Sequence, residues 1–100
     1  MDFGGNESRL LLKLMSVCNL RQRVLADNVA NESTPGFKRR VVRFEELLGK
    51  ELDDALSGSK PVNFARIEPR VEFDPTTPAG TDGNNVDLEA ENAALRENRL

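Results

Sequence analysis

Apolar residues recur every three or four positions through residues 6–31, and this spacing predicts one long amphipathic helix. Leu10, Val17 and Val24 widen the apolar face along a neighbouring row. About 25 residues of helix span roughly 38 Å at 1.5 Å per residue, which is too long for a small domain to cover by itself. We therefore expect this helix to pack in a bundle. Its main stripe consists of Leu11, Leu14, Met15, Cys18, Leu25 and Val29.

Polar residues interrupt the stripe and mark its end. An arginine and a glutamine lie in its middle, and Asn28 and Asn31 lie beside its last turn. Such interruptions are typical of a bundle helix that needs a defined register, so we predict that Asn28 and Asn31 set this register. Asn6 or Ser8 can cap the start of the helix.

The helix is expected to end at the sequence Thr-Pro-Gly-Phe, residues 34–37. Pro35 disfavours the helical conformation in the residue before it, and Gly36 is free to take a positive φ. The four residues fit a type II turn, with proline second and glycine third. The first segment of the chain is therefore the axial helix with its turn, residues 1–37.

The middle of the chain, residues 38–85, has shorter and weaker patterns and predicts an irregular segment that contains β-structure. Apolar positions predict a short helix over residues 45–56. Residues 62–74 suggest one or two short strands broken at Pro69, and the Pro- and Gly-rich stretch that follows predicts a loop.

A helical pattern returns in residues 86–100. Asp87 is the expected N-cap, and the acidic residues that follow suit the first turn of a helix. The apolar stripe is thin, with Leu88 and Leu95 as its large members, and no stop signal precedes Leu100, so we expect a truncated helix. Together the three segments predict a mainly α fold, with a long N-terminal helix, a small irregular middle segment that contains β-structure and the start of a C-terminal helix.

Composition excludes several classes of function. The 100 residues contain no His and one Cys, so this chain alone cannot build a Ser–His–Asp or Cys–His site, a structural zinc site or a disulfide. We expect no cofactor and no metal. No apolar stretch approaches the length of a membrane helix, and the start lacks the basic region of a cleaved secretory signal. A carboxylate enzyme, a charge-driven binder and an assembly subunit remain open.

Two charged clusters were candidates for chemistry or binding. The basic cluster of Lys38, Arg39, Arg40 and Arg43 fits either a binding patch for an acidic partner or a solvated strand flank balanced by the acidic helix after it. The net charge of −3 and the lack of Tyr and Trp argue against nucleic acid. The carboxylates near residues 82–91 lack calcium-loop spacing, and neighbours on an exposed helix do not tune one another for catalysis, so we predict no catalytic residue.

The string at the end of the first helix is more specific than an ordinary helix end. The pattern Asn-x-Ala-Asn-x-x-Thr-Pro-Gly-Phe/Tyr resembles the signature of the bacterial flagellar rod and hook axial proteins. A second string, at the entry to the C-terminal helix, is similar to that of the proximal rod members of this family. The first motif consists here of Asn28, Ala30, Asn31, Thr34, Pro35, Gly36 and Phe37, and the second of Asp82, Gly83, Asn84, Val86 and Asp87.

The resemblance implies a non-enzymatic structural subunit that assembles into the proximal rod and transmits torque from the motor to the hook and filament. It implies export by the flagellar apparatus without a cleaved signal, and a place in the basal body within the periplasmic space. Its partners would be other rod proteins, basal-body ring components, the export apparatus and further copies of itself. The resemblance also implies that the long N-terminal helix pairs with the C-terminal helix like a coiled coil. The apolar stripe of the long helix, together with Leu88 and Leu95, would pack the two helices or neighbouring subunits. The alternative is a small binding module that uses the basic cluster at 38–43.

Overall fold

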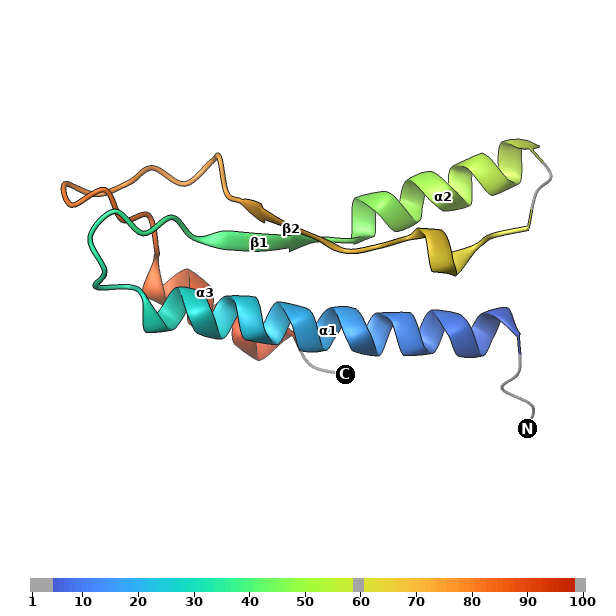
Figure 1. Cartoon of the computed structure of the whole chain (residues 1–100), viewed down its shortest axis with the longest axis horizontal. Coiled ribbons are helices and arrows are strands. Elements are labelled where there is room, and N and C mark those ends of the chain that lie inside the picture. Colours follow the sequence, from blue (N-terminus) through green and yellow to red (C-terminus); the bar gives the residue numbers. More distant parts are fainter. Residues whose placement is uncertain (1–4, 59–60, 99–100) are drawn as a thin grey trace.

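The fold was analysed in a computed structural model that describes residues 5–58 and 61–98. The described chain is mainly helical and elongated, with principal extents of 51 × 30 × 17 Å. Figure 1 shows α1 along one side and the strands with α2 in a second layer above it. The mainly α prediction is therefore confirmed. In chain order the elements are α1 (Asn6–Ala30), β1 (Arg40–Arg43), α2 (Glu45–Gly58), the 3-10 helix η1 (Phe64–Arg66), β2 (Arg70–Phe73) and α3 (Leu88–Glu97).

Helix α1 follows its apolar periodicity without interruption for 25 residues. Its N-cap position is Gly5, with a φ of 78°, rather than Asn6 or Ser8, so the expected cap is wrong. The predicted turn after the helix is confirmed, because Phe37 N–H donates to the carbonyl of Thr34 at 3.2 Å and Gly36 has a φ of 78°. A positive φ at this third position is what a type II turn requires.

The middle segment is a two-stranded antiparallel sheet flanked by helical turns. Val42 of β1 lies opposite Val71 of β2, and Arg40 lies opposite Phe73. Strand β2 begins directly after Pro69, as the sequence predicted, whereas the apolar residues before this proline form η1 instead of a strand. Helix α2 has the predicted start and extends two residues beyond the predicted end, to Gly58.

The core lies between one row of α1 side chains and the middle segment. Val17 of α1 is 2% exposed and packs with four buried apolar residues from β1, its flank and η1. This row recurs in steps of four and three residues, which keeps it on one face of the helix. The sequence indicated Leu10, Val17 and Val24 only as a widening of the main stripe, yet Val17 is the α1 residue of the buried core cluster and the other two pack against it. The row contains Leu10, Leu14, Val17, Arg21, Val24 and Asn28, and its apolar partners are Val42, Phe44, Phe64 and Ile67.

Helix α3 lies antiparallel to the C-terminal half of α1 (Figure 1). Glu91 near its start contacts Asn28, whereas Asn98 just past its end donates from Nδ2 to the carbonyl of Cys18 at 2.9 Å. Asp87 caps the helix by accepting a hydrogen bond from the N–H of Ala90, as predicted. The helix was expected to run to residue 100, but it ends at Glu97, with Asn98 at the C-cap position; residues 99 and 100 lie outside the described residues.

Candidate functional site

The two sequence motifs meet in one structure at the C-terminal end of α1. Gly36 N–H donates to the carbonyl of Asp82 at 2.8 Å, and Asn85 N–H donates to the carbonyl of Phe37 at 3.3 Å. Gly83 has a φ of 81°, and a Cβ added to it would lie 3.3 Å from the Cα of Gly36. Both turns favour glycine because both residues have a positive φ, and at Gly83 the nearby Gly36 backbone leaves no room for a Cβ as well. We call this region the motif junction, and it comprises residues 28–39 and 82–91, together with Asp74, which pairs with Arg39.

Two buried asparagines of the second motif hold the ends of the first. Asn84 donates from Nδ2 to the carbonyls of Asn31 at 2.9 Å and Thr34 at 2.8 Å. Asn85 accepts at Oδ1 from the N–H of Arg39 at 2.6 Å. Carbonyls at a helix C-terminus lack intrahelical donors, and here a side chain 53 residues away supplies one. Sequence reasoning included Asn84 in the motif but missed Asn85.

Asn28 joins α1 to the free edge of β1. Its amide donates to the carbonyl of Arg40 at 2.8 Å and accepts from the N–H of the same residue at 3.0 Å. Arg21, two turns earlier on α1, donates to the carbonyl of Val42 at 3.1 Å. These side chains satisfy the outward-facing backbone groups of β1 that a neighbouring strand would otherwise bind. The contacts of Asn28 therefore fix where β1 lies along α1.

A buried ion pair lies at the centre of the motif junction. Glu91 is 0% exposed, and its Oε1 accepts from Nε of Arg39 at 2.5 Å. The same guanidinium donates to Asp74 at 2.5 Å, and Asn28 lies 3.3 Å from Glu91. Burying a carboxylate is costly unless it is paired and hydrogen-bonded, and Glu91 has both kinds of partner. Glu91 lies in the first turn of α3, as the sequence predicted, but the expected exposure is wrong, because Arg39, 52 residues away in the sequence, pairs with it in the interior.

Electrostatics in this cluster favour the charged forms. The hydrogen bond with Glu91 raises the pKa of Arg39. The hydroxyls of Thr77 and Thr76, a backbone N–H and Arg39 hold the pKa of Asp74 well below its usual range. Every buried side-chain nitrogen or oxygen in the described residues has a hydrogen-bond partner. The cluster is therefore a saturated polar network.

Within the described chain, the side chains of the remaining motif residues form hydrogen bonds only with nearby residues of the sequence or form none. Asn31 donates to the carbonyl of Asp27 at 2.9 Å and accepts from the hydroxyl of Thr34 at 3.2 Å, so it closes the end of α1. Asn31 was predicted to set the register of the helix, but these two side-chain contacts stay within the end of α1 and the turn after it. Asp82 accepts from the N–H of Asn84 at 3.1 Å. Ala30 and Pro35 are exposed, and Val86 is half-buried.

The basic cluster is divided among different partners. Arg39 belongs to the motif junction, and Arg43 pairs with Glu72 at 2.5 Å and Glu46 at 3.2 Å. The Arg40 guanidinium lies 5.4 Å from the ring centre of Phe73. The acidic helix supplies only part of the balancing charge, because Glu72 of β2 and the acids of the motif junction supply the rest. The four cations do not form one open patch.

The predicted assembly residues fall into two groups along α1. Leu25 is buried, and Leu14, Cys18, Val29 and Leu95 are half-buried. The second group is exposed within the described chain, because α3 ends alongside Cys18 and does not reach the N-terminal half of α1. It consists of Leu11, at 48% exposed, and Met15, at 44%. Leu88 lies apart from both groups, as the first residue of α3, and is 42% exposed.

The described part of the chain contains neither a cluster of metal-binding side chains nor a membrane-spanning helix. Among residues 5–58 and 61–98, no group of three or more cysteine and carboxylate side chains could hold a metal ion. Nor does any helix there combine the length and apolar character needed to cross a membrane.

Relatives of this chain are flagellar proteins. A flagellar basal body rod protein FlgB from Borreliella burgdorferi is 33% identical, over 88% of this chain and 76% of its own length. Proteins of the same name from Proteus mirabilis and Bacillus subtilis are each 29% identical over 86% of this chain, and 72% and 70% of their own lengths. Comparison with models of known protein families finds no match.

These similarities place the chain among the structural proteins of the flagellar basal body rod, as its two motifs predicted. More narrowly, it belongs to the FlgB family.

Proposed function

We propose that this chain is a subunit of the proximal part of the rod and that it transmits torque from the motor to the hook and filament. It acts through contacts with other rod proteins, ring components and further copies of itself. It reaches the periplasmic space through the flagellar export apparatus without a cleaved signal. Membership of the FlgB family supports this proposal most strongly.

The division of α1 supports the same proposal. Its C-terminal half is held rigidly by the motif junction, whereas Leu11 and Met15 expose apolar surface on the continuation of the face that packs against α3. Exposed apolar side chains in a row mark surfaces that bind other protein segments. A subunit that assembles end to end needs both a fixed geometry and such an open face.

Motility tests this function. The full gene, carried on a plasmid in a strain that lacks its chromosomal copy, is given the double substitution Leu11→Asp and Met15→Asp. We expect loss of swimming and of isolated rods, with the variant still produced, because both side chains are already exposed. Deletion of residues 28–37, or Asp at both Leu25 and Val29, should also abolish assembly, through loss of the fold.

The matched control is Asn19→Asp, which adds a carboxylate at an exposed polar position on α1. This variant should swim normally. Normal swimming and normal rods in the Leu11 and Met15 double variant would contradict the proposed function of the stripe.

A further inference from the structure

Helix α2 has an apolar ridge that the rest of the described chain leaves open. Its inner side chains, Leu47 and Leu48, pack on the core, while Leu52 and Leu56 are 39% and 82% exposed. These two leucines are one turn apart and share a face, which we call the α2 ridge. Gly49, one turn earlier, has open space around its Cβ position, so another surface can approach closely. Figure 1 shows α2 at one end of the molecule, beyond η1.

The charge on α2 is strongly acidic. Its 14 residues contain five carboxylates and one lysine. Asp53, next to the ridge, is exposed. A surface that accepts this helix therefore needs an apolar floor and cationic edges.

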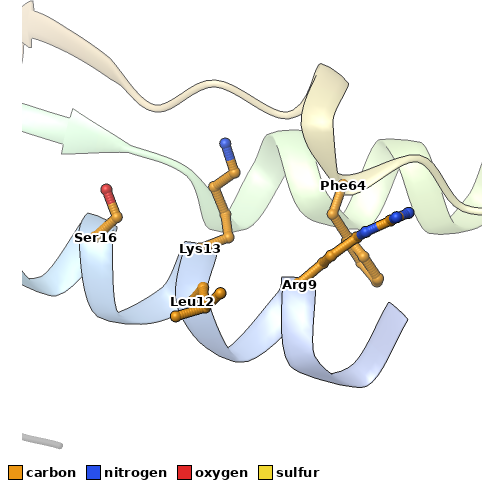
Figure 2. A pocket seen from close by; sticks show the side chains of 5 residues that line it. All are labelled: Arg9, Leu12, Lys13, Ser16 and Phe64. Carbon is orange, nitrogen blue, oxygen red and sulfur yellow. The ribbon is translucent and has the colours of Figure 1, made fainter. Parts of the chain in front are cut away.

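A groove between α1 and η1 has these properties. Figure 2 shows Leu12 and Phe64 facing the groove, with Arg9, Lys13 and Ser16 around it. Its volume is about 350 Å³. Leu12 is 64% exposed, whereas Phe64 is buried and forms the floor. Lys13 already pairs with Glu68 at 3.2 Å, but Arg9 has no carboxylate partner among the described residues. We call this the α1–η1 groove.

The groove is separate from the face of α1 that packs against α3. Leu12 follows Leu11 directly, and successive residues of a helix point about 100° apart. A helix that continues α3 along Leu11 and Met15 would therefore leave the groove open. The groove is also out of reach of the α2 ridge of its own chain, because η1 and the chain on either side of it lie between α2 and α1 (Figure 1).

We propose that the α2 ridge of one copy of this chain docks in the α1–η1 groove of a second copy. Leu52 and Leu56 contact Leu12 and Phe64, and the acidic helix pairs with Arg9 at the edge. The ridge and the groove are different surfaces, so the contact is heterologous and can repeat from copy to copy. This inference rests on the self-association in the proposed function, and it assigns the surfaces that associate.

Mixing two variants tests the contact. Leu56→Asp breaks the ridge and Leu12→Asp breaks the groove, and both residues are exposed enough for the fold to persist. Each variant alone should associate at least about tenfold more weakly than the unsubstituted chain, because one leucine leaves the contact. An equimolar mixture should form a one-to-one dimer, since the intact ridge of one meets the intact groove of the other. Sedimentation velocity and NMR shifts at increasing concentration measure both effects.

The matched control is Ser57→Asp, which adds the same charge to α2 but points about 100° away from Leu56. It should associate as the unsubstituted chain does. The proposal is overturned if the unsubstituted chain stays monomeric at millimolar concentration, or if the mixture stays monomeric. It is also overturned if Leu12→Asp changes the NMR shifts of groove residues to the same extent at every concentration, because the occupant would then belong to the same chain.

Disulfide trapping gives a second readout. In a Cys18→Ser background, cysteines at positions 16 and 56 (Ser16→Cys and Leu56→Cys) should form covalent dimers on mild oxidation, because docking brings these positions together. Moving the second cysteine to position 57 (Ser57→Cys) should reduce the yield severalfold, and equal yields would contradict the docked geometry.

The motility strain separates this inference from the proposed function. Loss of rods in the Leu56→Asp strain as well as in the Leu11 and Met15 double variant supports both. Normal rods in the Leu56→Asp strain alone overturn the docking contact and leave the rod function standing. Normal rods in both strains overturn both.

Discussion

The two ends of α1 are built on different physical principles. Around its C-terminal half, the motif junction buries an ion pair and three asparagines, and each has its partners. Around its N-terminal half, the core is purely apolar and large side chains remain exposed, among them Leu11, Leu12 and Met15. Directional polar contacts specify one geometry, whereas open apolar faces accept partners. The chain therefore fixes its own shape at one end of α1 and leaves apolar surface open at the other end, where the proposed function places assembly.

Removing the buried ion pair is the most severe test of the difference between the two halves of α1. We expect Glu91→Ala to lower the free energy of unfolding by about 2–4 kcal/mol, because Arg39 Nε loses its buried acceptor, although Arg39 keeps its pair with Asp74. Urea unfolding monitored by circular dichroism measures this loss. Glu89→Ala, in the same turn of α3 but exposed, should change the stability by less than about 0.5 kcal/mol. A loss below about 1 kcal/mol in Glu91→Ala would show that the network does not hold the two motifs together.

A pair of glycine substitutions sharpens the same comparison. Gly83→Ala should destabilise by about 1–3 kcal/mol, because alanine is strained at a φ of 81° and its Cβ meets the Gly36 backbone. Gly49→Ala in α2 should instead stabilise by roughly 0.5–1 kcal/mol, since its site is open and alanine favours helix. Thermal melts of the two variants measure both signs. Equal changes in stability for the two variants would mean that the backbone is packed no more closely at Gly83 than at Gly49.

Much of the fold could be predicted because its signals are local. The apolar period of α1, the Pro35–Gly36 turn and the Asp87 cap each depend on residues within a few positions of one another. The family motif residues were identified for the same reason, since they occur as short strings.

What could not be predicted depends on contacts between distant residues. Periodicity showed two neighbouring apolar rows on α1 but not which row the middle segment covers. The burial of Glu91 depends on Arg39, and an exposed acid in a first helical turn has the same local sequence. The residues before Pro69 form η1 because Phe64 and Ile67 both turn into the core, which an alternating strand does not allow at this spacing.

The smallest effect on stability is expected from acid titration of a contact in the middle of α1, where its two halves meet. Glu45, at the start of α2, pairs with Arg21 in the middle of α1 at 2.8 Å, and this hydrogen bond lowers the pKa of Glu45. The folded state therefore binds fewer protons than the unfolded state near pH 4, so the contribution is complete above that pH and declines as the pH falls through the lowered value. Asp74 acts in the same direction through its own lowered pKa.

Glu45→Gln should thus cost about 0.2–1 kcal/mol at neutral pH, because the pair is largely exposed, and it should flatten the fall in stability between about pH 5 and pH 3. Urea unfolding at a series of pH values, with the exposed Asp53→Asn as the control, measures the slope. An unchanged slope in Glu45→Gln would assign the acid sensitivity to the motif junction alone. The two halves of α1 would then be coupled only through their apolar core, and the polar contacts of Arg21 would fix the position of β1 without adding stability.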